Sequence, residues 1–139
     1  MEVSLAFLAD HAEFVTGKLN ARGIFDQVYS PFFPLAGYEL YVVLNLVAEP
    51  AEFDTRQAIR LQLINSDGIV GRDINGEVNI TRDLGGYPLE IPSILPLSGL
   101  TFPEPGEYHF LVSIQGEPKK RIPIYVRLKQ DLIGDYQGE

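Results

Sequence analysis

The chain has 139 residues, 45% of them hydrophobic, which is enough material for one domain with a packed core. Its net charge of -8 argues against nucleic acid as a partner, because phosphate binding needs a basic surface. Cysteine, an N-terminal export signal and an apolar run of the ~20 residues that a membrane helix needs are all missing, so we expect a cytoplasmic protein without a membrane partner.

Short β-type runs separated by turn residues begin at the N-terminus. Val3–Leu8 is apolar and predicts a strand, and the two glycines within Gly17–Ser30 predict a turn followed by a bulged strand. Pro31–Pro34 cannot lie in a central strand, so we expect a connection or an edge there.

The clearest strand pattern covers Tyr38–Ala48. Its even-numbered residues are apolar, which predicts a core-facing side, while the other side mixes polar Glu39 and Asn45 with apolar residues. Ala58–Ile64 predicts a second alternating strand.

Two dipeptides predict tight turns after this strand. Asp67-Gly68 is the first, and Asn75-Gly76 is the second, with short strands around Ile69–Ile74 and Glu77–Thr81. A calcium loop is rejected here, because the glycine and the acidic residue of such a loop do not fall at the required positions.

The segment Tyr87–Pro105 contains five prolines, so it predicts an edge strand or an extended crossover. Tyr108–Ile114 and Ile122–Leu128 then alternate as two strands of a hairpin. For both apolar sets to face one core, paired positions must sum to an even number. We therefore predict a three-residue loop, Gly116–Pro118.

That three-residue loop pairs His109 with Tyr125 and Glu107 with Arg127. The expected domain covers residues 1–129, with a flexible C-terminal tail over residues 130–139. Taken together, these elements predict an all-β fold, a two-layer antiparallel immunoglobulin-like sandwich of about seven to nine strands.

Two segments carry a family resemblance. They are Gly17-Lys18-Leu19-Asn20 with Gly23-Ile24-Phe25-Asp26 running into Pro31–Pro34, and Phe102-Pro103-Glu104-Pro105-Gly106-Glu107-Tyr108. Together they resemble a family of small uncharacterised bacterial β-sandwich proteins, a domain of unknown function, over about residues 9–127. The resemblance implies a bacterial cytoplasmic setting and no mechanism. In immunoglobulin-like modules, the second segment delivers a buried tyrosine whose hydroxyl reaches back to the backbone.

No constellation of residues supports an enzyme, a cofactor or a metal. Asp10, His11 and Glu13 form the densest polar group near the first strand, but the chain has only two histidines and no cysteine for a metal site. We interpret Asp10 as a turn cap and the other two as solvent-facing. His109 lacks a nucleophile or a paired carboxylate, so a surface or interface role is favoured for it.

Several outward-facing positions are more apolar than a solvated sheet requires. If their strands are neighbours, they form an exposed patch edged by His109 and Arg127. Such a patch favours a non-catalytic protein-interaction or structural module that binds itself as a homodimer or binds another protein. Alternatively, the N-terminal segment or the proline-rich segment covers them. The apolar residues of this predicted patch are Tyr41, Val43, Val47, Leu111 and Tyr125.

Two further alternatives remain open. The chain could be a small-ligand binding domain, for example for a carbohydrate, with Phe32, Phe33 and Tyr87 as an aromatic platform in loops at one end. Residues 119–129 hold five of the eleven basic residues, which is typical of a solvated edge strand but is also compatible with an acidic partner.

Overall fold

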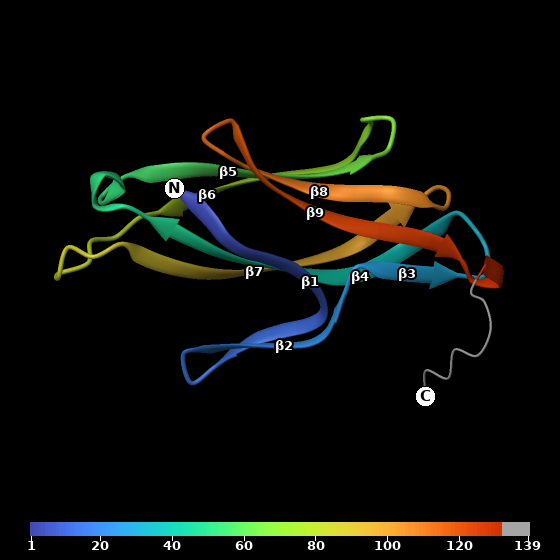
Figure 1. Cartoon of the computed structure of the whole chain (residues 1–139), viewed down its shortest axis with the longest axis horizontal. Helices are drawn as coiled ribbons and strands as arrows, with labels where there is room; N and C mark the ends of the chain where they lie inside the picture. Colours follow the sequence, from blue (N-terminus) through green and yellow to red (C-terminus); the bar gives the residue numbers. More distant parts are fainter. Residues whose placement is uncertain (132–139) are drawn as a thin grey trace.

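The computed structural model describes residues 1–131 and contains nine β-strands and two 3₁₀ turns in that range (Figure 1). The strands are β1 (Glu2–Val15), β2 (Lys18–Phe25), β3 (Gln27–Ser30), β4 (Leu35–Ala48), β5 (Arg56–Asn65), β6 (Val70–Asn79), β7 (Leu89–Phe102), β8 (Gly106–Ile114) and β9 (Glu117–Leu128). The 3₁₀ turns are η1 (Pro50–Glu52) and η2 (Lys129–Asp131). The described residues contain no helix with the length and apolarity of a membrane span.

The strands form two sheets that pack against each other, which confirms an all-β, two-layer architecture. One sheet has four strands in the order β2-β1-β4-β7, and the other has five in the order β3-β9-β8-β5-β6. All strand pairs are antiparallel except β3 with β9, which is parallel. The chain first passes from one sheet to the other at Asp26, between β2 and β3. The Asp26 carbonyl accepts a hydrogen bond of 2.7 Å from the Tyr125 amide on β9.

The core lies between the sheets and follows the alternation that the sequence predicts. The inward residues of β4, from Leu40 to Ala48, are at most 1% exposed, and they meet the inward residues of β5, β8 and β9. Aliphatic side chains on alternating positions of both sheets thus exclude water from one continuous interior, the main driving force for folding.

Strand β1 is longer than the predicted Val3–Leu8 and serves two neighbours in turn. Its first part pairs with β4 from Glu2 to Ala9, and its second part pairs with β2 from Leu8 to Val15. A bulge between Val3 and Leu5 puts Val3 on the core side and Leu5 on the outer side. Figure 1 shows β2 and the end of β1 projecting as a hairpin from the four-stranded sheet.

The predicted turn at Asn75-Gly76 is wrong. β6 continues through both residues, with Asn75 paired to Arg60 and Gly76 to Ile59 on β5. The Asp67-Gly68 turn is confirmed, because the Asn65 carbonyl accepts a 3.0 Å hydrogen bond from the Gly68 amide and closes the β5–β6 hairpin. Gly76 has no left-handed φ, so the continuing ladder with β5 prevailed over the local turn preference.

The proline-rich segment is an edge strand, one of the two predicted alternatives, because within residues 1–131 β7 pairs only with β4. Pro92 lies opposite Asn45 and Pro96 opposite Tyr41, and the ladder continues past both. The two prolines are four residues apart, so their ring nitrogens point to the same side of the strand. That side is the open one, where two N–H donors are therefore missing.

The β8–β9 hairpin has a two-residue turn instead of the predicted three-residue loop. Gln115 and Gly116 both adopt left-handed φ values, 53° and 77°, as a type I′ turn requires. A bulge beside Val112 then adds one residue to β9, so Phe110 pairs with Ile122 and the sum is again even. The parity argument is confirmed, but the loop is wrong. His109 faces Pro123, and Glu107 faces Tyr125.

Tyr108 at the start of β8 is 7% exposed, and its hydroxyl donates a 2.6 Å hydrogen bond to the Glu104 carbonyl. The ring packs edge-to-face on Phe102, with centroids 5.0 Å apart. Burial of the ring together with this hydrogen bond fixes the turn between the two sheets, as the sequence motif predicts.

At the C-terminal end, β9 closes at Leu128 and η2 follows. The first two residues of the predicted tail, Gln130 and Asp131, belong to η2, and the rest of the tail lies outside the described residues.

Candidate functional site

The predicted outward patch is divided between the two sheets. Tyr41, Val43 and Val47 lie on β4 of the four-stranded sheet, whereas Leu111 on β8 and Tyr125 on β9 belong to the five-stranded sheet. Each group points away from the core of the sandwich, so the two groups lie on opposite outer faces. The condition for a single patch, neighbouring strands, is therefore not met, and the two faces need separate descriptions.

The outer face of the four-stranded sheet is apolar across all its strands, and we call it the apolar face. The register places Ile24, Ala9, Tyr41 and Pro96 in one row across the sheet. None of its large side chains belongs to the core cluster. The residues that define the apolar face are Leu5, Phe7, Ile24, Tyr41, Val43, Val47 and Ile94.

No other element within residues 1–131 lies over the apolar face. The N-terminal segment and the proline-rich segment were the two candidates for covering it, but they form β1 and β7 and flank β4 within the sheet. Ile24 is consequently 64% exposed and Leu5 48% exposed. An antiparallel sheet that faces water normally alternates polar with apolar residues on its two sides, so this face is more apolar than a solvated sheet face usually is.

The side chains of the apolar face differ in exposure: Ile24 and Leu5 are exposed, most of the others are half-buried, and Val43 is buried. The sequence predicted it as part of an exposed patch, but it is 0% exposed. The register places it between Phe7 on β1 and Ile94 on β7, and these larger neighbours shield it. Val43 therefore packs beneath its neighbours, and the side chains of those neighbours form the solvent-accessible surface of the face.

Polar side chains lie at one end of the apolar face and also within it. At one end, the His11 ring stands edge-on to Tyr41 with centroids 5.1 Å apart, and its Nε2 lies 3.0 Å from a Glu13 carboxylate oxygen. Within the face, Asn45 lies between Val43 and Val47 on β4 and opposite Leu5 on β1, and it donates a 3.0 Å hydrogen bond to Glu90.

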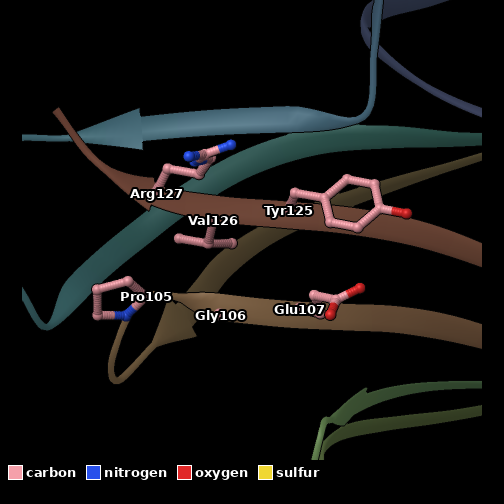
Figure 2. A pocket seen from close by; sticks show the side chains of 6 residues that line it. All are labelled: Pro105, Gly106, Glu107, Tyr125, Val126 and Arg127. Carbon is pink, nitrogen blue, oxygen red and sulfur yellow. The ribbon is translucent and has the colours of Figure 1, made fainter. Parts of the chain in front are cut away.

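The outer face of β8 and β9 has a different character. Two hollows of about 490 and 420 Å³ follow each other along β9 and share Glu107 and Tyr125. Figure 2 shows Tyr125 and Arg127 along β9 with Glu107 on the neighbouring β8. We call the combined concavity the basic trough, and its defining residues are Glu107, His109, Arg121, Pro123, Tyr125 and Arg127.

The two arginines of the basic trough form no salt bridge within residues 1–131. Arg121 instead donates to Nε2 of His109 at 3.0 Å. Burial, and then the charge of Arg121, lower the pKa of His109 below its ordinary value. His109 is therefore neutral at pH 7 and accepts the bond, which leaves the charge of Arg121 uncompensated.

The first part of β9 is a solvated edge strand, as its basic composition predicted. Only Tyr125–Leu128 pairs with β3, so the first part of β9 has a strand neighbour on one side alone. Lys119 in this part is held by Glu2 at 3.1 Å and Glu117 at 2.7 Å. The charge of Lys119 is thus paired, whereas Arg121 and Arg127 are among the basic residues of β9 that have no acidic partner within residues 1–131.

The aromatic platform of the ligand-binding alternative is not assembled. Phe32 and Phe33 lie between β3 and β4, while Tyr87 lies between β6 and β7, and these loops are at opposite ends of the sandwich (Figure 1). Phe32 and Tyr87 are 70% and 73% exposed. They are too far apart to line one ligand site at one end.

The polar group near the first strand is also divided. Asp10 lies within β1 and caps no turn, and its side chain fills the space above Gly23. His11 and Glu13 have the opposite strand parity and point to the outer side. In the described part of the chain, no three His, Cys, Asp or Glu side chains are grouped as metal ligands.

Sequence reasoning missed Leu5, Phe7, Ile24 and Ile94 as members of the apolar face. Their strands have apolar residues on both sides, so alternation did not separate outer positions from core positions. The strand register would have distinguished outer from core positions. It depends on the Val3–Leu5 bulge, however, which the sequence does not reveal. Arg121 was noted only as part of a basic segment.

No curated protein matches the chain. A family model, described as a family of unknown function (DUF6941), matches residues 4–127. These residues include every strand bar the ends of β1 and β9. The chain therefore belongs to this family of unknown function, DUF6941.

Proposed function

We propose that this protein is a non-catalytic interaction module that binds another protein chain, a second copy included, through the apolar face. The observation that carries the proposal is the apolar surface that extends across four strands, interrupted on β4 by Asn45, and that no element of residues 1–131 covers. Burying such a surface against a partner releases water from it and stabilises the complex.

The physical case rests on the cost of leaving this surface in water. A side chain such as Ile24 contributes roughly 1.5–3 kcal/mol when it passes from full exposure to full burial. Ile24 and Leu5 are among the most exposed large apolar side chains of the sheets, and both lie on this face. Tyr41 adds an aromatic ring with a polar tip, a residue type enriched at interfaces.

We further propose that the sandwich is immunoglobulin-like. In that fold the strands are divided into one sheet with A, B and E and another with G, F and C. The assignment of β1, β4 and β7 to the first sheet, and of β9, β8 and β5 to the second, supports the comparison. The Tyr108 hydrogen bond at the start of β8 supports it as well. A bacterial cytoplasmic setting remains an expectation from the sequence.

The experiment compares two glutamate variants with matched exposure. Ile24→Glu places a charge on the apolar face, and Ile69→Glu places one at a site that is 63% exposed, against 64% for Ile24, in the β5–β6 turn. Solution mass is measured by light scattering, and co-purifying proteins are quantified from cells that produce each full-length variant. We expect Ile24→Glu to lose the association that both wild type and Ile69→Glu retain.

Leu111→Glu serves as a second control, because Leu111 lies on the opposite outer face. The proposal fails if wild type and Ile24→Glu have the same mass and the same bound proteins. It also fails if Leu111→Glu is as damaging as Ile24→Glu, since the apolar face would then not be the contact surface.

A further inference from the structure

The second outer face carries an independent inference, which starts from charge. Residues 119–129 hold five basic residues and no acidic one, although the chain has a net charge of -8. The remainder of the chain therefore carries -13. A strand that keeps its positive charge within so acidic a protein forms a local site of opposite sign to its surroundings.

The two β5 arginines of the five-stranded sheet are neutralised by neighbours, whereas Arg72 on β6 donates to the Ser98 carbonyl at 2.7 Å. On β5, Arg60 pairs with Asp73 at 2.5 Å and Arg56 with Glu77 at 3.9 Å. On β9, Arg121 has only neutral His109, and Arg127 has no acidic partner within residues 1–131. The two β9 arginines are thus charges for which the described structure supplies no counter-charge.

The spacing of these arginines defines the shape of a complementary ligand. Arg121 and Arg127 have the same strand parity and are six residues apart, which corresponds to about 20 Å along an extended strand. Between them lie Pro123 and Tyr125, and Glu107 faces Tyr125 from β8. The ends of the basic trough are therefore positive, and its middle is aromatic with one negative charge.

We propose that the basic trough binds an extended acidic segment of another protein, with one carboxylate on Arg121 and another about 20 Å away on Arg127. The part of the segment between the two carboxylates is neutral on the side that faces the trough, because Glu107 repels a further acid there. Guanidinium groups bind carboxylates through paired N–H donors, which favours this partner over a single small anion.

His109 links this binding to protonation. The charged groups around its ring are Arg121 on β9 and Glu107 on β8. A carboxylate on Arg121 offsets the positive charge that opposes protonation of His109. Binding of the acidic segment therefore raises the pKa of His109, and a fall in pH toward that pKa strengthens binding.

The probe is a capped seven-residue peptide, Glu-Ser-Thr-Ser-Thr-Ser-Glu, titrated into the full chain and followed by NMR. The first control peptide has glutamine at both ends. The second has glutamine at the ends and glutamate at positions three and five, so its net charge equals that of the probe. We expect the probe to shift resonances of residues 107–109 and 121–127 and to bind roughly fivefold more tightly than either control.

Arg121→Gln and Arg127→Gln should each weaken binding of the probe roughly fivefold, and Arg56→Gln on the same sheet should leave it unchanged. The pKa of His109 should rise when the probe is bound. Equal binding of the probe and the central-glutamate peptide would overturn the proposal. So would tighter binding of a seven-nucleotide thymidine strand, which would indicate a phosphate site instead.

Discussion

The two outer faces of this sandwich differ in what their side chains lack. On the four-stranded sheet, large apolar groups such as Ile24 lack cover, whereas on the five-stranded sheet Arg121 and Arg127 lack counter-charges. Both faces are solvated surfaces of the same domain, but in our two proposals a partner buries the apolar groups of the first and supplies opposite charge to the second. A single sandwich can thus present two contact surfaces that respond to different physical conditions.

The largest expected contrast concerns buried charge. Val43→Asp puts a carboxylate at a position that is 0% exposed and should lower the free energy of unfolding by about 3 kcal/mol or more. Leu111→Asp, half-buried and paired in register with Arg121, should cost about 1 kcal/mol or less. Urea unfolding of both variants measures the difference. Equal losses would show that the two faces are equally tolerant of charge.

Salt should separate the two faces next. Raising NaCl from about 0.05 to about 0.5 M shortens the screening length. The affinity of the basic trough for the acidic probe peptide should therefore fall severalfold. Association through the apolar face should stay constant or strengthen, because apolar burial does not depend on charge screening. Titrations of both at several salt concentrations test this. Parallel weakening would mean that the apolar face also associates through charge.

A small apolar cavity elsewhere in the sandwich adds a third site to the comparison. A cavity of about 130 Å³ opens between β6 and β7 at Gly76, where an added Cβ would meet nothing within 4 Å. Gly76→Val should fill it and stabilise the fold by about 1 kcal/mol. Thermal unfolding measures the gain. Ile24→Glu, in contrast, should weaken association without changing the free energy of unfolding. A variant that changed both quantities would contradict this separation of the two sites.

The smallest expected effect concerns pH. Because folding lowers the pKa of His109, the unfolded chain takes up more protons near and below pH 6.5. The stabilisation from neutral His109 is complete above that pH and declines as the pH falls through the lowered pKa. His109→Gln should make unfolding less sensitive to pH between about 6.5 and 5. An unchanged pH slope would assign the sensitivity to other groups.

Local patterns predicted much of the fold. The apolar even-numbered residues of Tyr38–Ala48 predicted both the strand and its buried side, and the prolines of β7 predicted an edge strand or a crossover, of which the edge strand is correct. The parity of the β8–β9 pairing was also predictable, because both apolar sets must face one core. These features depend on residues close in sequence or on a single shared constraint.

The errors arose where distant strands decide the outcome. Asn75-Gly76 favours a turn locally, but pairing with β5 held both residues in β6. The even pairing of β8 with β9 came from a tight turn plus a bulge, two features that compensate each other and leave no net signal in the sequence. Assignment of Tyr41 and Tyr125 to different faces required the sheet order, which alternation does not contain.

The two prolines at the edge of β7 have a consequence for how copies of this protein could polymerise. An open-ended fibre built by edge pairing needs two accepting edges on every unit, so that each added copy offers a new site. On this side of the sandwich, β6 is free of proline but β7 lacks donors at Pro92 and Pro96. If β6 of one copy pairs with β6 of another, the resulting dimer has no further proline-free edge on this side. Growth through this pair of edges then stops at the dimer.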